Sequence, residues 1–236
     1  MAVRPDPGFV PLEREGVRGF LHTPEENTGR GMVLTHGAGG DSTSPLLVTV
    51  ANAFCSAGVT VLRCDLPFRQ QRRTGPPSPG NSAADRAGLR TAVAVLRDLG
   101  RGDVVLAGHS YGGRQASMLA AEEPGLAHGL LLLSYPLHPP KKPEQLRIQH
   151  LPKLQTPTVF VHGTADPFGS IAEIRQAVAL IPAPTQVLTI EGAGHSLGAG
   201  RFDPTATIAA LLSGEMGPRQ NNRRTAENLR PSSPQS

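Results

Sequence analysis

The chain has 236 residues, of which 38% are hydrophobic, 18% are charged and only 4% are aromatic. This length accommodates one α/β domain or two small domains, and it buries a continuous core without disulfide or metal staples. The 27 glycines and 23 prolines are too many for a helical bundle and are typical of a fold with many strand-to-helix turns.

Charge and cysteine content exclude several classes of partner. A formal net charge of +4, without aromatic residues among the basic ones, does not indicate nucleic-acid binding. Cys55 and Cys64 show neither a CxxC pattern nor the Cys/His spacing of a metal site. Residues 1–11 carry charges and three prolines, unlike a signal peptide, and no apolar run approaches the roughly 18–20 residues of a membrane span. We therefore expect a reduced, cytoplasmic protein with no membrane or nucleic-acid partner and no bound metal.

The first half of the chain predicts four strands and two helices. Residues 1–7 look like a flexible lead-in, and two half-alternating segments around Glu15-Gly16 predict a hairpin. Residues 65–81 are rich in Pro and Arg, have no periodicity and are expected to form a loop. The expected elements are the strands Phe9–Arg14, Val17–His22, Gly31–Thr35 and Val59–Arg63 and the helices Pro45–Ala57 and Ser82–Leu99.

The second half repeats a strand–helix pattern. It predicts the strands Asp103–Ala107, Gly129–Leu133, Thr156–Val161 and Gln186–Ile190 and the helices Ser110–Glu122, Ser170–Leu180 and Pro204–Leu212. Apolar strands that alternate with helices indicate an α/β fold: a mostly parallel eight-stranded sheet covered by helices on both faces, with the hairpin at one edge. We expect one domain over residues 8–213, and a disordered tail over 214–236, where the composition is too polar to fold.

The strongest functional pattern is Gly108-His-Ser110-Tyr-Gly112-Gly, between a predicted strand and a predicted helix. A serine in such a turn lifts its hydroxyl above the sheet, and glycines two residues before and two after it remove Cβ atoms that would collide. The context is that of the nucleophile elbow of α/β-hydrolases. The alternative is a glycine-rich helix start at which Ser110 is only an N-cap.

A serine nucleophile needs a base and an orienting carboxylate, which in this fold follow it in the order acid, then histidine. Asp166 follows the seventh predicted strand, and His195 follows the eighth and is the only histidine downstream of Asp166. All three residues therefore lie at the carboxyl edge of the sheet, where ligands of open α/β sheets bind. Asp103 begins its strand at the opposite edge and Asp203 follows His195, so both are poor rivals.

Structural roles are the alternatives for the acid and the histidines. Asp166 before Pro167 also fits a turn-forming residue, and His195 also fits a residue that only satisfies loop carbonyls. His36 and His162 flank glycines at strand ends, where hydrogen bonding to loop backbone is favoured over contact with substrate.

Acyl transfer also needs N–H donors for the developing oxyanion. One is expected from the backbone of Tyr111, directly after Ser110, and the second from Ala38 or Gly39 in the loop after the third strand. A phosphate-binding glycine loop is the alternative for residues 36–40, but both nucleotide-binding glycine patterns are absent there.

Four motifs, taken in order, resemble a known family. They are Thr35–Gly40, Arg63–Arg69, Gly108–Arg114 with Ala116–Met118, and His162–Phe168. Over about residues 17–213 the chain resembles the KANL/Tex-type α/β-hydrolase-like proteins, mostly uncharacterised predicted hydrolases, and is more distantly similar to dienelactone hydrolases. The resemblance implies Ser110, Asp166 and His195 as the triad. Dienelactone hydrolases proper use a cysteine nucleophile where this chain has serine, and some eukaryotic members of the resembled family serve as complex subunits.

Residues 134–155 are too few and too Pro-rich for a large helical lid, which predicts a shallow, open site. We expect Tyr111, Leu137, Phe168 and the loop 65–73 to line it, with Arg69 placed to contact an anionic substrate or else solvated at the surface. The prediction is a serine hydrolase that cleaves a carboxylic ester, thioester or similar small acyl substrate through an acyl-enzyme on Ser110, without a cofactor. The alternative is a non-catalytic binding or complex-forming protein on the same fold; the sequence does not indicate an oligomeric state.

Overall fold

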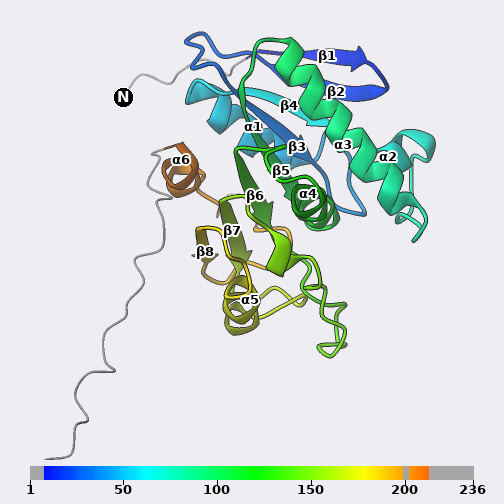
Figure 1. The fold of residues 1–236 in the computed structure, drawn as a ribbon, viewed down its shortest axis with the longest axis vertical. Coiled ribbons are helices and arrows are strands. Elements are labelled where there is room, and N and C mark those ends of the chain that lie inside the picture. The colour runs from blue at the N-terminus through cyan, green and yellow to red at the C-terminus, as the bar shows by residue number, and fades with distance from the viewer. Residues whose placement is uncertain (1–7, 199–201, 213–236) are drawn as a thin grey trace, which may run out of the picture.

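The computed structural model describes residues 8–198 and 202–212, which form one eight-stranded sheet with helices on both faces (Figure 1). The expected lead-in 1–7 and the expected tail 214–236 lie outside the described residues. The strands are β1 (Phe9–Arg14), β2 (Val17–His22), β3 (Arg30–Thr35), β4 (Thr60–Cys64), β5 (Asp103–His109), β6 (Gly129–Leu133), β7 (Thr158–Gly163) and β8 (Thr185–Ile190). The helices are α1 (Pro45–Ser56), α2 (Pro67–Gln71), α3 (Asn81–Asp98), α4 (Tyr111–Glu122), α5 (Ile171–Val178) and α6 (Thr205–Leu212), with a 3-10 turn η1 (Leu151–Lys153).

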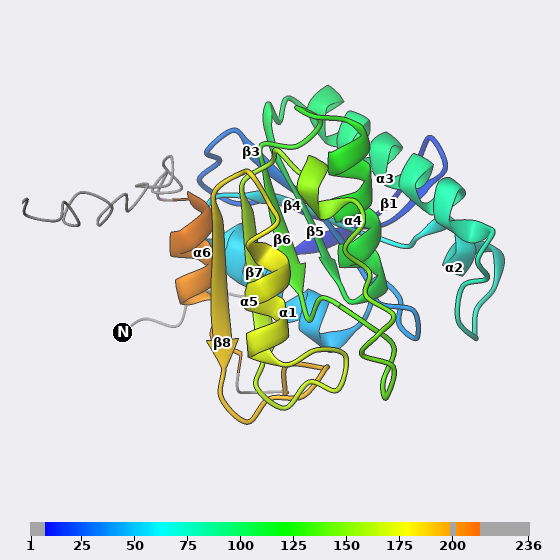
Figure 2. The ribbon, with the colours of Figure 1, turned by 60° about the horizontal axis from the view of Figure 1, so that its bottom comes forward.

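The strand order is β1-β2-β4-β3-β5-β6-β7-β8. β1 and β2 form the predicted antiparallel hairpin, and β2 pairs antiparallel with β4. All the other neighbours are parallel. The loops that follow β3, β5, β7 and β8 therefore leave the sheet at one common edge, which is the lower edge in Figure 2.

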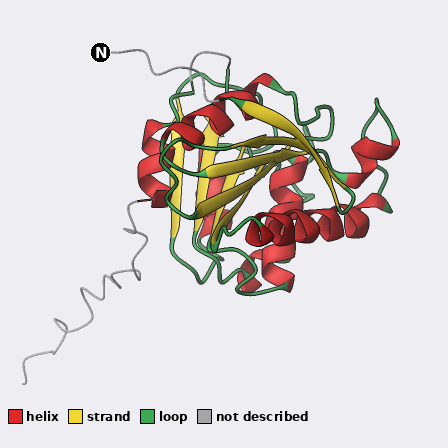
Figure 3. Ribbon diagram, turned by 90° about the horizontal axis from the view of Figure 1, so that it is seen from above, coloured by secondary structure: helices red, strands yellow, loops and turns green. Residues whose placement is uncertain are grey.

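Strand β6 shows why these strands are apolar on both faces. Successive side chains point to opposite sides of a strand. Leu130 and Leu132 accordingly pack with the layer of α3, α4 and α5, whereas Leu131 and Leu133 pack with the layer of α1 and α6. Figure 3 shows the two helical layers on either side of the sheet. Burial of one leucine side chain contributes about 1.5–3 kcal/mol, so the two layers together hold the central strands firmly in place.

The structure confirms the eight-stranded α/β architecture and the absence of a large helical lid, because only the short turn η1 lies between β6 and β7. It corrects the expected loop 65–81, which contains the helix α2. Pro67 at the first turn presets the helical φ angle, and the amide of Phe68 donates to Asp85 Oδ1 at 3.0 Å. Across the described ranges, the helices are all too short or too polar to span a bilayer.

Candidate active site

Ser110 occupies the sharp turn between β5 and α4. Its φ of 50° and ψ of −116° are rare for a residue with a side chain. The glycines around it allow the close approach of backbone that this turn requires. A Cβ on Gly108 would lie 2.5 Å from the Gly113 nitrogen, and a Cβ on Gly112 would lie 2.5 Å from the His36 carbonyl oxygen. The geometry is the strained strand–turn–helix that the motif predicts.

A chain of hydrogen bonds runs from Ser110 through His195 to Asp166. His195 Nε2 lies 2.8 Å from Ser110 Oγ, and His195 Nδ1 lies 2.8 Å and 3.0 Å from the two carboxylate oxygens of Asp166. Because a carboxylate only accepts hydrogen bonds, Nδ1 carries the proton of the neutral ring and Nε2 accepts from the serine hydroxyl. The structure therefore brings the three predicted residues together in the order that a general base needs.

Asp166 is held ionised in a buried position. Burial acts to raise the pKa of this carboxyl, but hydrogen bonds from the His195 ring and from the Phe168 amide outweigh it. The pKa of Asp166 consequently lies below its usual value. The ring of Phe168 stacks on His195 with centroids 4.1 Å apart, so the imidazole is fixed by packing as well as by hydrogen bonds.

Ser110 and His195 line a cavity of about 1070 Å³, and the buried Asp166 lies behind His195. The site is therefore larger than the predicted shallow one. Two connections form part of its sides: the Pro-rich segment 76–79 after α2, and the segment after β6 that contributes Pro136 and Arg147. Ala38, Gly39, Tyr111 and Phe168 line the cavity, as the sequence predicts.

Arg69 does not line this cavity. Its side chain is 6% exposed, and its guanidinium donates to the carbonyl oxygens of Gly40 at 2.9 Å, Ala38 at 2.8 Å, Gly75 at 3.1 Å and Arg72 at 3.2 Å. The sequence places Arg69 at the correct edge of the sheet but does not show which way its side chain points. The expected contact between Arg69 and substrate is therefore wrong. Arg69 instead stabilises the glycine-rich loop 37–40 through hydrogen bonds to its carbonyls.

His36 also stabilises the loop 37–40. Its Nδ1 donates to the Gly37 carbonyl at 2.8 Å, and its Nε2 accepts from the Leu66 amide at 3.1 Å. His162 similarly donates from Nε2 to the Gly169 carbonyl at 2.8 Å. Both histidines are buried and bond loop backbone, which was the favoured prediction for them. Leu137 is also buried and does not line the cavity, where its neighbour Pro136 takes the expected place.

Sequence reasoning missed several polar residues that line the cavity, among them Arg114, Gln115 and Arg147. Arg114 carried a usable signal, because it lies four residues after Ser110 and thus one helical turn along the same face of α4. Arg147 lies in a segment without periodicity, so its position depends on tertiary packing. Within residues 8–198 and 202–212, we find no group of three His, Cys, Asp or Glu side chains suited to a metal ion.

The sheet order, the turn at Ser110 and the hydrogen-bonded chain at the carboxyl edge together define an α/β-hydrolase. The chain belongs to the alpha/beta hydrolase domain family, which matches residues 28–211. This match supports the α/β-hydrolase part of the resemblance, whereas the KANL/Tex-type family itself stays a prediction.

Three solved structures illustrate the similarity. Est1E from Butyrivibrio proteoclasticus is 18% identical with a TM-score of 0.65, covering 86% of this chain and 96% of its own. A dienelactone hydrolase from Anabaena variabilis is 24% identical with a TM-score of 0.65, covering 88% and 95%. XC6422 from Xanthomonas campestris, described as a serine hydrolase without lid, is 16% identical with a TM-score of 0.61, covering 83% and 88%. At these identities the similarity shows the fold.

Proposed function

We propose that this hydrolase is a serine esterase that cleaves a carboxylic ester, thioester or similar small acyl substrate through an acyl-enzyme on Ser110. The observation that carries the proposal is the unbroken hydrogen-bonded chain from Ser110 Oγ to the Asp166 carboxylate, which opens into the cavity. A nucleophile, a base and an orienting acid in hydrogen-bond contact are what this chemistry needs.

In the first half of the reaction, Ser110 Oγ attacks the substrate carbonyl while His195 Nε2 takes its proton. The imidazolium then gives this proton to the leaving group as the bond to the acyl carbon breaks, which leaves the acyl group on Ser110. In the second half, His195 takes a proton from water, the hydroxide adds to the acyl carbon, and the proton returns to Ser110 Oγ as the acid departs. Asp166 holds the ring and stabilises its positive charge.

Two backbone amides are placed to stabilise the oxyanion. The amides of Tyr111 and Ala38 belong to residues that line the cavity beside Ser110, and among the described residues neither donates a hydrogen bond to another backbone group. Gly39, the next residue of the loop, is the alternative donor. Arg69 and His36 hold this loop in place before substrate arrives, which is the preorganisation that oxyanion stabilisation requires.

Cys64 is the alternative nucleophile to consider, and its environment does not suit that role. Burial raises the pKa of the Cys64 thiol to about 12, and the negative charge of Asp65 adds to this rise. A thiol must ionise to attack, so Cys64 stays inert near neutral pH.

The test is labelling by a fluorophosphonate probe, together with hydrolysis of p-nitrophenyl esters of increasing chain length. We expect wild type to be labelled and Ser110→Ala to lose both labelling and about 10³–10⁶-fold in kcat, because triad members act as a unit. Ser170→Ala is the matched control, since it removes a serine hydroxyl at the N-cap of α5, outside the cavity. Full activity in Ser110→Ala would reject the proposal, and absence of labelling in wild type would favour the non-catalytic alternative.

A further inference from the structure

Two arginines line the same cavity as Ser110 without an acidic partner. Arg114 lies one turn after Ser110 in α4, and Arg147 comes from the connection between β6 and β7. Nε of Arg114 is buried and donates no hydrogen bond to any described residue. Arg147 Nη1 donates only to the Pro136 carbonyl, at 3.2 Å. Across the described ranges, neither guanidinium has a carboxylate within ion-pair distance.

Gln115 adds a third unpaired donor to this wall. Its side chain is 0% exposed and lines the cavity. Its Oε1 accepts from Ser82 Oγ at 2.8 Å and from Arg86 Nη1 at 3.2 Å. Because an arginine only donates, the atom that faces Arg86 must be the amide oxygen, which fixes the orientation of the amide. Nε2 is then left buried without an acceptor.

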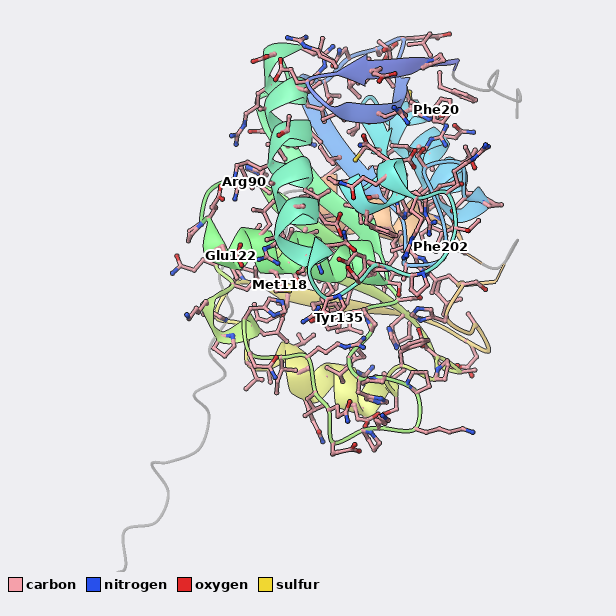
Figure 4. All side chains as sticks on the ribbon, turned by 90° about the vertical axis from the view of Figure 1, so that its right-hand side faces the viewer. Phe20, Arg90, Met118, Glu122, Tyr135 and Phe202 are labelled. Atoms are coloured by element: carbon pink, nitrogen blue, oxygen red, sulfur yellow. The ribbon has the colours of Figure 1, made fainter. Side chains whose placement is uncertain are left out.

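Other arginines of the same helical layer do have acidic partners. Arg86 of α3 pairs with Glu122 of α4, and Arg90 of α3 pairs with Glu123 at the end of α4. Figure 4 shows Arg90 and Glu122 on the outer side of these two helices. The inward-facing arginines have no such acid. Burial, followed by the charge of Arg114, lowers the pKa of Arg147.

We propose that Arg114, Arg147 and Gln115 bind a carboxylate of the substrate, so that the ester cleaved at Ser110 carries a second, anionic group. Both guanidiniums line the cavity and have no carboxylate partner among the described residues, and a ligand carboxylate supplies the acceptor oxygens that they lack. The planar guanidinium matches the two oxygens of a carboxylate, and the Gln115 amide supplies a further N–H. This inference deepens the proposed function and rests on it.

The spacing and the remaining wall describe the rest of the ligand. Ser110 and Arg114 are separated by about 6 Å along the helix axis, since four residues rise 1.5 Å each. Leu46, Leu47, Pro77 and Phe202 line the other parts of the cavity and suit an aliphatic or aromatic spacer between ester and carboxylate. The substrate class is therefore the half-ester of a dicarboxylic acid, or an ester whose leaving group bears a carboxylate.

The kinetic test compares esters that differ only in this charge. On the acyl side, mono-4-nitrophenyl adipate is compared with 4-nitrophenyl hexanoate; on the leaving-group side, 4-acetoxybenzoate is compared with its methyl ester. We expect wild type to prefer the charged ester of at least one pair. Arg114→Gln and Arg147→Gln should lower kcat/KM for that ester by about 10- to 100-fold, the usual loss for a charge-assisted hydrogen bond, and for its neutral partner by less than about threefold.

Arg73→Gln is the matched control, because Arg73 is exposed and does not line the cavity. It should change neither ester, and an equal loss in Arg73→Gln would show general electrostatic attraction and overturn the subsite. Equal effects of Arg114→Gln on charged and neutral esters, in a variant that melts like wild type, would also overturn it. Arg147→Gln keeps the test valid if Arg114→Gln fails to fold, since Arg147 lies outside the helices.

A binding measurement separates failure of the subsite from failure of the proposed function. Monomethyl adipate is titrated calorimetrically into Ser110→Ala and into Ser110→Ala/Arg114→Gln. Binding to the first and at least tenfold weaker binding to the second supports the subsite even when no ester is hydrolysed, in which case only the proposed function fails. Hydrolysis that depends on Ser110, with no difference in binding between the two proteins, overturns the subsite and leaves the proposed function standing.

Discussion

Arg69 and Arg114 lie at the same edge of the sheet, and their surroundings differ. Arg69 follows β4 and is 6% exposed. Its guanidinium donates hydrogen bonds to the backbone carbonyls of Gly40, Ala38 and Gly75. Arg114 follows β5, lines the cavity, and leaves its buried Nε without an acceptor among the described residues. Both side chains carry the same charge and lie close to the loop or helix that positions Ser110.

The difference teaches that the role of an arginine follows from where its donors go. Arg69 has its acceptors inside the protein, so it holds the loop 37–40 in shape and has little left to offer a ligand. Arg114 lines the cavity and has no acidic partner among the described residues, which is why we assign it to substrate. Variants at the two positions should therefore differ in kind: one should lose structure, and the other should lose selectivity.

The largest loss of activity is expected for substitution of Asp166, and the losses in the two arginine variants are compared with it. Asp166→Asn should lower kcat by about 10⁴-fold for neutral and charged esters alike, because an amide favours the wrong tautomer of His195. The fold should persist, as monitored by circular dichroism and urea unfolding. Asp98→Asn, an exposed acid on α3, is the control and should keep full activity. An Asp166→Asn protein within about tenfold of wild type would remove Asp166 from the proposed mechanism.

Arg69→Gln should cost stability and activity together. The shortened side chain leaves the carbonyls of Ala38, Gly40 and Gly75 without their donor, and a buried bond to a charged group contributes about 1.5–3 kcal/mol. We expect the free energy of unfolding in urea to fall by about 3 kcal/mol. The activity lost should be the same for both members of an ester pair, because the loop serves both. A loss confined to the charged ester would instead return Arg69 to the role of a substrate contact.

Much of this site was predictable from the sequence because it depends on local rules. Apolar strands and glycine-rich turns identify the carboxyl edge, and chain order then selects Asp166 and His195 as partners of Ser110. The direction of the Arg69 side chain was not predictable, since a position at the correct edge does not say which face a residue presents. The walls of the cavity were not predictable either, because segment 76–79 and Arg147 reach the site only through tertiary packing.

The third prediction uses pH to measure the positive charge of the arginine wall. His150 Nε2 lies 2.8 Å from Ser117 Oγ, whose own proton is donated to the Arg114 carbonyl, so the histidine must be the donor to the hydroxyl. Burial, followed by the charges of Arg114 and Arg86, lowers the pKa of His150 to about 4. The ordinary pKa of an unfolded histidine is about 6.5, so between these values the unfolded chain binds more protons than the folded one.

Stability contributed by neutral His150 is therefore complete above pH 6.5 and is lost as the pH falls toward 4. Urea unfolding at pH 7 and pH 5 should show that His150→Gln, which keeps an N–H donor, loses less stability on acidification than wild type by about 1–2 kcal/mol. In Arg114→Leu the acid-induced loss should shrink for the same reason, because one of the charges that lower the pKa of His150 is gone. Identical pH dependence in wild type and His150→Gln would contradict this account of the wall.

The smallest expected effect is the change in the free energy of unfolding of Arg114→Leu, and the sign of this change tests the role of Arg114. Arg114→Leu removes a buried donor that lacks an acceptor and relieves repulsion with Arg147, while leucine and arginine have nearly equal helix propensity. The free energy of unfolding should therefore stay unchanged or rise by about 0.5–1 kcal/mol, even as hydrolysis of the preferred charged ester falls. Arg86→Leu is the matched control in the neighbouring helix, because it breaks the ion pair with Glu122 and the bond to Gln115, and it should lower stability by about 1–2 kcal/mol. If both leucine variants were destabilised equally, Arg114 would have acceptors inside the folded protein, and it would belong with Arg69 among the arginines that hold structure.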